Sequence, residues 1–229
     1  MNRKVGVILS GCGFLDGSEI HEAVLTLLCL DELGATAVCM APRGPQQHVV
    51  DHERSAPYGE SRDILREAAR IARGRIQDIA RVSAQQLDAV VLPGGYGAAK
   101  NLSDFASKGA EAKPHAEVAR LLREMHAAKK PIGAICIAPA VVAATLGRQV
   151  QPTLTIGDDA GTAKALTAMG VVHRTCPVTE CVIDAKNRIV SSPAYMFDAR
   201  VRDVAAGIRK LVAAVMTMVE EGSGTGAAR

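Results

Sequence analysis

The stretch Lys130-Pro131-Ile132-Gly133-Ala134-Ile135-Cys136-Ile137-Ala138-Pro139-Ala140 decides the fold, because an apolar run ends abruptly at the cysteine within it. Small residues lie two positions before and two positions after this cysteine, as a backbone that folds back on itself requires. Pro139 suits the first turn of a helix, where no N–H is needed. The stretch therefore predicts a strand, a sharp turn at Cys136 and a helix.

Two interpretations of Cys136 are open. A thiol at the N-terminus of a helix lies in positive potential, which favours the thiolate, the reactive form. The alternative is an inert cysteine that fills a core position, since free cysteine is among the most buried residue types. The strand, turn and helix around Cys136 favour the nucleophile.

The composition is that of an ordinary globular protein, with 229 residues, 48% of them hydrophobic and 22% charged. Aromatic residues make up only 3% of the chain, which argues against single-stranded nucleic-acid binding by base stacking. The net charge of +3 is too small to indicate a nucleic-acid partner. We expect a small-molecule substrate and no nucleic acid.

The six cysteines are scattered and form no C-x-x-C pair, so we expect neither a metal site nor a metal cofactor. The N-terminus lacks the apolar segment of a signal peptide, and no apolar run is long enough to span a membrane. These features predict a cytoplasmic protein with free thiols, without membrane contact.

Apolar runs and turn residues predict one doubly wound α/β domain over residues 1–221, with a disordered tail over 222–229. Buried strands are expected over 4–9, 36–40 and 87–92, with short strands near Val171, Val182 and Ile189. Helices are expected over 61–80, 114–129 and 197–219, ahead of Met169, and after a capping box at Asp16 and Glu19. This last helix would bury an apolar face of Ile20, Ala23, Val24, Leu27 and Leu28.

Several polar segments allow two interpretations. The glycine-rich loop over residues 10–18 could bind phosphate or form a tight turn, but it lacks G-x-G-x-x-G. Residues 42–53 read as a loop or lid, where a His48–His52 metal pair is disfavoured by the Pro and Gly context. The basic helix over 61–80, which Gly74 is expected to interrupt or to end in its first part, could be a solvated face or an anion or subunit contact. Residues 93–97 could expose backbone N–H groups to an anion.

Three signatures together resemble the PfpI-like superfamily, which has a class I glutamine amidotransferase-like fold. They are a carboxyl after the first strand, Leu-Pro-Gly-Gly-Tyr-Gly at residues 92–97, and Ala-Ile-Cys-Ile-Ala-Pro at residues 134–139. The segments Gly11–Val24 and Glu67–Gly74 more specifically resemble the ElbB proteins, known for enhancing lycopene biosynthesis and as isoprenoid-biosynthesis proteins. The resemblance covers residues 4–220.

The resemblance implies a flavodoxin-like three-layer sandwich with a mostly parallel sheet and late antiparallel additions, assembled as a homodimer. It makes Cys136 the nucleophile and Glu22, which by spacing alone only complements a helix dipole, the carboxyl that hydrogen-bonds it. It assigns oxyanion-binding N–H groups to Gly95 and Ile137. Gly11, Cys12, His21 and Tyr96 would lie near the substrate.

ElbB relatives are associated with glyoxalase activity, which converts glyoxal to glycolate without glutathione or metal. The resemblance therefore implies a cofactor-free lyase acting on a small reactive dicarbonyl, glyoxal first and methylglyoxal second. Ile137 departs from peptidase-like members, which have His there, and the only H-x-E element, His115 to Glu117, precedes the cysteine. A redox-responsive or partner-binding protein with an oxidisable Cys136, or a degenerate glutamine amidotransferase-like subunit, remain as alternatives.

Overall fold

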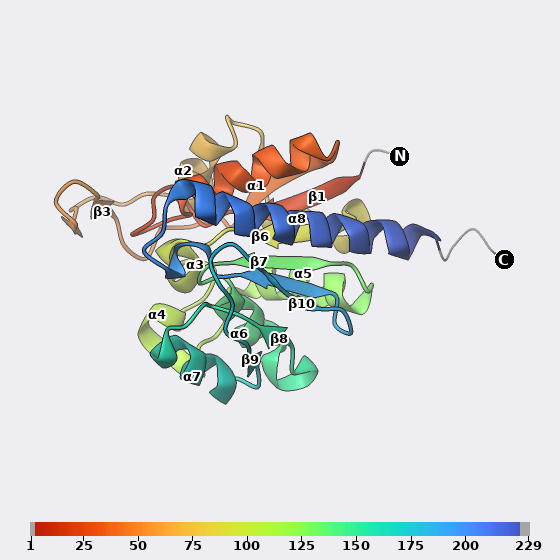
Figure 1. The fold of residues 1–229 in the computed structure, drawn as a ribbon. Helices are drawn as coiled ribbons and strands as arrows, with labels where there is room; N and C mark the ends of the chain where they lie inside the picture. Colours follow the sequence, from red (N-terminus) through yellow and green to blue (C-terminus); the bar gives the residue numbers. More distant parts are fainter. Residues whose placement is uncertain (1–2, 225–229) are drawn as a thin grey trace.

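The computed structural model describes residues 3–224, which build a three-layer sandwich around a seven-stranded sheet (Figure 1). The strand order is β10-β11-β7-β6-β1-β2-β5, and all neighbours run parallel except β10 and β11. The strands are β1 Lys4–Ile8, β2 Thr36–Ala41, β5 Ile76–Asp78, β6 Ala89–Leu92, β7 Ile132–Ile135, β10 Val182–Asp184 and β11 Ile189–Ser192. The predicted flavodoxin-like fold with a late antiparallel strand is confirmed.

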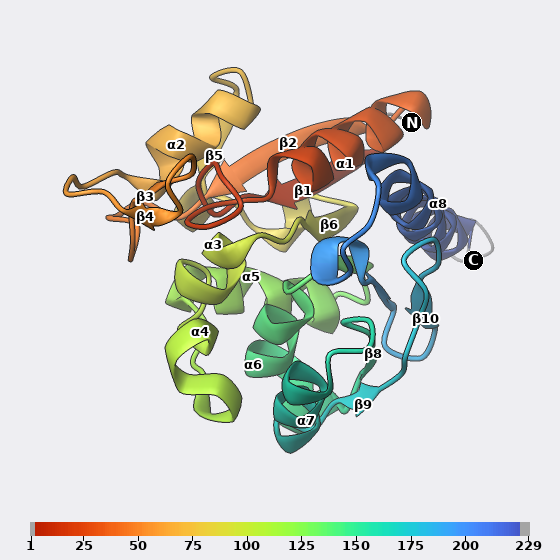
Figure 2. The same cartoon turned by 60° about the vertical axis from the view of Figure 1, so that its left-hand side comes forward.

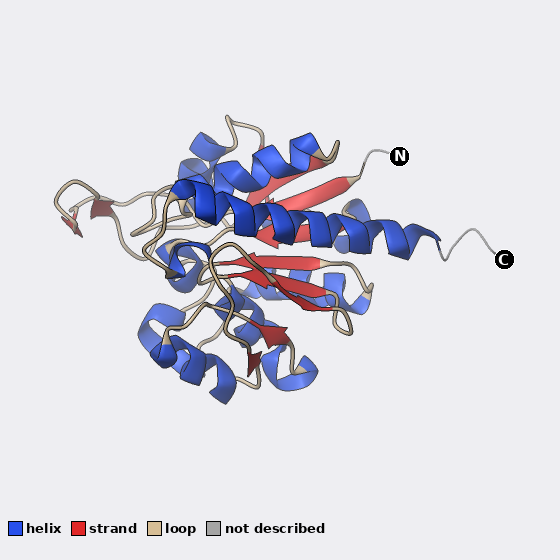
Figure 3. Ribbon diagram, viewed as in Figure 1, coloured by secondary structure: helices blue, strands red, loops and turns tan. Residues whose placement is uncertain are grey.

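Helices cover both faces of the sheet (Figures 2 and 3). One face carries α1 Ile20–Glu32, α2 Ile64–Ile71 and α8 Val201–Gly224. The other carries α3 Tyr96–Lys100, α4 Phe105–Lys108, α5 Ala116–Ala127, α6 Pro139–Val150 and α7 Ala160–Ala168. Two small ribbons complete the fold, β3 Val50–Asp51 with β4 Ala56–Pro57, and β8 Thr153–Leu154 with β9 Val172–His173.

The alternation of side chains along β6 accounts for the two layers. Ala89 and Val91 are fully buried among residues of α1 and α8, whereas Val90 and Leu92 are fully buried among residues of α5 and α6. Successive side chains of a strand point to opposite faces. A short strand that is apolar throughout can therefore fill two cores at once, which a central parallel strand requires.

Four loops meet at the carboxyl edge of the sheet, where ligand sites of open α/β sheets lie. They follow β1, β6, β7 and β11, and backbone hydrogen bonds join them. Gly97 N–H donates to Gly17 C=O over 2.8 Å, Glu19 N–H donates to Gly94 C=O over 3.0 Å, and Cys136 N–H donates to a Ser192 carbonyl over 2.8 Å. The loop over residues 10–18 is a tight turn held by these contacts.

The predicted capping box at Asp16 is wrong, because α1 begins one turn later in the loop. Glu19 is the N-cap, and its carboxylate accepts the Glu22 N–H over 2.7 Å. Asp16 instead accepts the Val50 N–H over 2.8 Å. That bond ties the glycine loop to the β3–β4 hairpin, which projects from the molecule within the segment expected to be a loop or lid (Figure 1).

The apolar face predicted for α1 is also wrong in part. Ala23 is buried, but Ile20, Val24 and Leu28 are 44%, 49% and 43% exposed. These three residues are spaced four apart, so they share one side of the helix. They form an exposed apolar stripe on α1.

The long helix predicted over residues 61–80 ends at Ile71. Arg73 and Gly74 both have positive φ, which turns the chain into β5. Arg62 lies ahead of the helix and pairs with Glu60 and Glu67, and Arg70 pairs with Glu67. These ion pairs agree with a solvated basic face.

The terminal helix α8 begins at Val201 rather than Phe197 and continues to Gly224. The disordered tail predicted from Gly222 is therefore wrong for residues 222–224, and residues 225–229 lie outside the described part of the chain. Within that described part, no helix combines the length and apolar character needed to cross a membrane.

Candidate active site

Cys136 occupies the sharp turn between β7 and α6 that the sequence predicts. Its φ of +60° lies in the left-handed region, which is uncommon for any residue other than glycine. Its N–H donates to the Ser192 carbonyl, and α6 begins three residues later at Pro139. The side chain is only 7% exposed. The neighbouring strand β11 thus holds a strained turn in place, as is typical of functional sites.

Glu22 lies in the first turn of α1 and is completely buried. One carboxyl oxygen accepts the Gly94 N–H over 2.8 Å, and the other accepts the Tyr195 N–H over 3.3 Å. The same carboxyl hydrogen-bonds the Cys136 thiol. The structure therefore brings Glu22 and Cys136 together, 114 positions apart in the sequence.

Two consecutive glycines make this approach sterically feasible. A Cβ at Gly94 would lie 2.5 Å from the Cys136 Cβ and 2.7 Å from Glu22 Oε2. Gly95 has a φ of +88°, and a Cβ there would lie 2.4 Å from the Glu19 backbone nitrogen. Because real Cβ atoms do not approach so closely, any side chain at Gly94 would push apart the thiol and the carboxyl.

Two backbone N–H groups point at the sulfur of Cys136. Gly95 and Ile137 both donate to it, from the loop after β6 and from the turn itself. Two converging N–H groups beside a nucleophile are the arrangement that stabilises an oxyanion in acyl-transfer enzymes. Gly95 and Ile137 are the residues to which the resemblance assigns that role.

Burial dominates the proton affinity of the pair. It raises the pKa of Glu22 to about 8, with a further contribution from the charge of Glu19, against the opposing hydrogen bonds from Gly94 and Tyr195. Burial and then the Glu22 charge raise the pKa of the Cys136 thiol well above its ordinary value, although the Gly95 and Ile137 N–H groups lower it. The expectation that the helix terminus favours the thiolate of Cys136 therefore disagrees with the direction of this pKa shift. Desolvation outweighs the helix terminus, and the ionisation of Cys136 depends on Glu22.

Cys136 opens onto a pocket of about 410 Å³. The chain has three Phe, three Tyr and no Trp, and four of these six aromatic side chains line the pocket together with two carboxylates and Met196. The aromatic residues are Phe14, Tyr96, Phe105 and Tyr195, and the carboxylates are Glu19 and Asp159. A second cavity of about 310 Å³, near Lys113, Arg123 and Arg148, includes neither Cys136 nor Glu22.

The four residues predicted to lie near the substrate have different positions relative to the pocket. Tyr96 lines the pocket. His21 is exposed and reaches the pocket only through Tyr195, whose hydroxyl hydrogen-bonds His21 Nδ1 over 2.9 Å. Gly11 and Cys12 lie outside the pocket lining, and Gly11 contacts Gln46 and Gly17 instead.

No histidine lines the pocket, although the described residues include all six. His115 caps α5 through the Glu117 N–H over 3.3 Å, so the H-x-E element has a structural role away from Cys136. Among residues 3–224, no group of three His, Cys, Asp or Glu side chains could hold a metal ion. The geometry consequently contains no amidotransferase triad around Cys136.

Sequence reasoning missed four contributors to the site: Glu19, Gly94, Ser192 and Tyr195. Gly94 lies in the segment over residues 93–97, which was predicted to expose backbone N–H groups. Its role as donor to Glu22, however, depends on packing. Glu19, Ser192 and Tyr195 have weaker sequence features that would indicate a site. Ser192 and Tyr195 follow a strand near Ile189 at the same sheet edge, which could have marked that segment as part of the site.

We predict that Glu22→Gln changes the pH dependence of stability. The Glu22 carboxyl loses its proton near pH 4.5 when unfolded and near 8 when folded. Between these values the folded state holds the extra proton, so stability falls as pH rises. The slope from one such group is at most about 1.4 kcal/mol per pH unit. Urea unfolding of both proteins from pH 5 to 8 measures this. Parallel stability curves would show that Glu22 is not the titrating group.

Two curated relatives are similar over almost the whole chain. A human protein named glutamine amidotransferase-like class 1 domain-containing protein 3, mitochondrial, is 45% identical over 225 residues, which are 94% of this chain and 83% of that protein. A rat protein named ES1 protein homolog, mitochondrial, is also 45% identical, over 94% of this chain and 84% of its own.

The names of these relatives contradict the predicted cytoplasmic location. Both proteins are called mitochondrial, and a zebrafish relative that is 33% identical over 233 residues is named ES1 protein, mitochondrial. The prediction used free thiols together with the lack of a signal-peptide segment and of a membrane-spanning run as its evidence. Free thiols indicate a reducing compartment and do not single out the cytoplasm.

Solved structures and a family model give the same assignment. An isoprenoid biosynthesis protein with an amidotransferase-like domain from Ehrlichia chaffeensis superimposes with a TM-score of 0.88 at 42% identity, covering 93% of this chain and 99% of the other. The model of the DJ-1/PfpI family matches residues 74–192, which contain Gly94 and Gly95, the sharp turn at Cys136 and β11. The chain therefore belongs to the DJ-1/PfpI family, within its class I glutamine amidotransferase-like and ElbB-like members.

Proposed function

We propose that this protein is a cofactor-free glyoxalase that converts glyoxal, and secondarily methylglyoxal, to the corresponding 2-hydroxy acid. The observation that carries the proposal is the buried hydrogen bond between Glu22 and Cys136, beside an open pocket. A carboxyl with a pKa near 8 exchanges protons efficiently near neutral pH. Membership of the DJ-1/PfpI family supports the same chemistry.

The first step is the addition of the Cys136 thiol to one aldehyde of glyoxal. Glu22, as carboxylate, takes the thiol proton while the sulfur attacks, and then passes that proton to the new alkoxide. The Gly95 and Ile137 N–H groups point at the sulfur, so they are close to the oxygen that becomes negative. The product is a hemithioacetal.

The second step moves a hydrogen between the two carbons. Glu22 takes the proton from the carbon bonded to sulfur, giving an enediol, and returns it to the neighbouring carbon. The sulfur-bearing carbon is oxidised to a thioester while its neighbour is reduced to CH₂OH, so no external oxidant is required. Water then cleaves the thioester, which releases glycolate and restores the thiol.

The pocket suits a neutral substrate better than an anion. Its volume of about 410 Å³ exceeds the size of glyoxal, and its aromatic and Met196 side chains present apolar surface. Glu19 and Asp159 contribute negative charge, and neither Lys nor Arg is among its lining residues. Small uncharged dicarbonyls are therefore the substrates that this proposal assigns.

We expect wild-type protein to form glycolate from glyoxal and Cys136→Ala to form none above background. Glu22→Gln should lower kcat at least about 100-fold, the usual contribution of an acid–base group. Glycolate measured by chromatography tests both variants. Cys181→Ala is the matched control, because Cys181 also carries a free thiol but lies outside the pocket lining. Unchanged glycolate formation by Cys136→Ala would disprove the mechanism.

The rate should rise with pH. Below the pKa of about 8, Glu22 is mostly protonated and cannot accept the thiol proton. We therefore expect kcat/KM to increase about tenfold per pH unit between pH 5.5 and 7.5 and to level off above 8. Initial rates with glyoxal across this range measure the profile. A rate that falls over the same range would contradict the role of Glu22 as base.

A redox-responsive role receives less support from the site. That role depends on a low-pKa, accessible thiol. Burial raises the pKa of Cys136, and its side chain is 7% exposed. We therefore keep the glyoxalase as the proposed function.

We further propose that the protein forms a homodimer through the exposed apolar stripe of Ile20, Val24 and Leu28 on α1. An exposed apolar row of this kind is typical of an interaction surface. Val24→Glu should convert a dimer to a monomer, measured by light scattering after gel filtration. Val172→Glu is the control, since Val172 is 57% exposed on β9, away from α1. A wild-type monomer, or a dimer that survives Val24→Glu, would refute this interface.

A further inference from the structure

The proposed reaction leaves one proton without a donor. Gly95 and Ile137 serve the oxygen on the carbon bonded to sulfur, and Glu22 carries the carbon-bound proton. When the enediol forms, the oxygen on the neighbouring carbon must also gain a proton. The pocket lining has no histidine to supply it.

Tyr195 is a pocket residue that contacts Glu22 directly and carries a side-chain hydroxyl. It lines the same pocket as Cys136, and its backbone N–H donates to Glu22 Oε1 over 3.3 Å. The preceding residue, Ala194, is fully buried and has a φ of +43°, an uncommon conformation for alanine. A strained backbone thus directs Tyr195 towards Glu22, as the strained turn directs Cys136.

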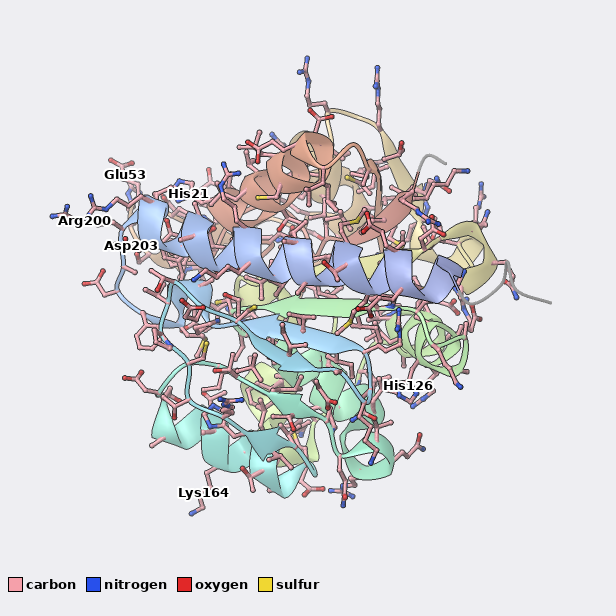
Figure 4. All side chains as sticks on the ribbon, turned by 45° about the vertical axis from the view of Figure 1, so that its right-hand side comes forward. His21, Glu53, His126, Lys164, Arg200 and Asp203 are labelled. Atoms are coloured by element: carbon pink, nitrogen blue, oxygen red, sulfur yellow. The ribbon has the colours of Figure 1, made fainter. Side chains whose placement is uncertain are left out.

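The hydroxyl of Tyr195 has its own partner. It hydrogen-bonds His21 Nδ1 over 2.9 Å, and the two rings lie 5.8 Å apart. His21 immediately precedes Glu22 on α1 and is exposed, so its imidazole connects the phenol to solvent. Figure 4 shows His21 on the same side of the molecule as Arg200 and Asp203, at the start of α8. Imidazole is the side chain that most readily exchanges protons near neutral pH.

We propose that Tyr195 is a catalytic proton donor of this site and that His21 is a positioning residue that acts through it. This inference rests on the proposed glyoxalase function. It assigns to a tyrosine, on a loop after β11, the acid role for which the pocket lining offers no histidine.

The protons balance over the two halves of the second step. As Glu22 removes the carbon-bound proton, the Tyr195 hydroxyl gives its proton to the second carbonyl oxygen. When Glu22 returns a proton to carbon, the first oxygen gives its proton back to the Tyr195 oxygen. Burial, Glu19 and Glu22 raise the pKa of Tyr195, so a bare phenolate is unfavourable there. The hydrogen bond to His21 stabilises the phenolate between the two transfers.

The test compares Tyr195 with a tyrosine that lies outside the pocket lining. Tyr195→Phe removes only the hydroxyl and should lower kcat with glyoxal about 100-fold while KM stays within about twofold. Tyr58→Phe is the control, because Tyr58 is 53% exposed and lies outside the pocket lining. It should retain wild-type kcat. Thermal unfolding of both variants identifies any loss caused by misfolding.

Chemical rescue tests His21. His21→Ala should lower kcat about tenfold, and added imidazole should restore it, because the position is open to solvent. His126→Ala, on α5 and far from His21 in Figure 4, should be unaffected with or without imidazole. A Tyr195→Phe protein with wild-type kcat overturns the role of Tyr195. A His21→Ala protein that imidazole does not restore overturns the role of His21.

Different results would contradict the proposed glyoxalase function and the proposed role of Tyr195. If wild-type protein forms no glycolate from glyoxal, the proposed function is wrong, and this role of Tyr195 is excluded with it. If wild-type protein is active and Tyr195→Phe is equally active, the glyoxalase remains and only the proton donor is wrong.

Discussion

The hydrogen bond between the buried Glu22 carboxyl and the Cys136 thiol is the constraint on which the rest of the carboxyl edge depends. A fully buried carboxyl is costly unless its oxygens are satisfied. Here the Gly94 N–H, the Tyr195 N–H and the thiol satisfy them. Each partner comes from the end of a different strand, so the carboxyl joins β6, β7 and β11 to α1.

This requirement explains the backbone strain at two residues of the site. Cys136 and Ala194 both have positive φ, and Gly94 has no room for a Cβ. Such conformations cost of order 1–3 kcal/mol each and persist only when their surroundings fix them. The Cys136–Ser192 backbone bond and the two bonds to Glu22 do so. The strain at these two residues therefore lies next to the atoms that converge on the thiol.

Structural features that depend on neighbouring residues in the chain were predicted well from the sequence. The apolar run before Cys136 and Pro139 after it predicted the sharp turn at Cys136. The predicted ends of the buried strands agree with the observed ends within one or two residues. The assignment of Glu22 came from resemblance, because spacing alone favours a residue that complements the helix dipole. Its contact with Cys136 joins residues of two distant segments, which no local pattern encodes.

The failures have the same physical origin. The apolar spacing of Ile20, Val24 and Leu28 correctly predicts a helix, but not which side of it faces the sheet. The basic run over 61–80 correctly indicated a break at Gly74, but it did not indicate that the chain beyond this break forms the strand β5. The prediction of a low pKa for Cys136 took the helix terminus into account but not the loss of hydration when the thiol is buried. Burial is a property of the whole fold, and it raises the pKa of Cys136 where the helix terminus was expected to lower it.

Ile137 shows how one departure can alter the chemistry without removing it. An apolar side chain beside the thiol leaves no adjacent imidazole, so the sulfur depends on Glu22 for its proton transfer. Burial is the largest cause of the raised pKa of Glu22. A carboxyl with an ordinary pKa would be too weak a base to take a proton from carbon near neutral pH. In the proposed reaction, the carboxyl made more basic by burial therefore carries out the proton transfer that an adjacent imidazole would otherwise perform.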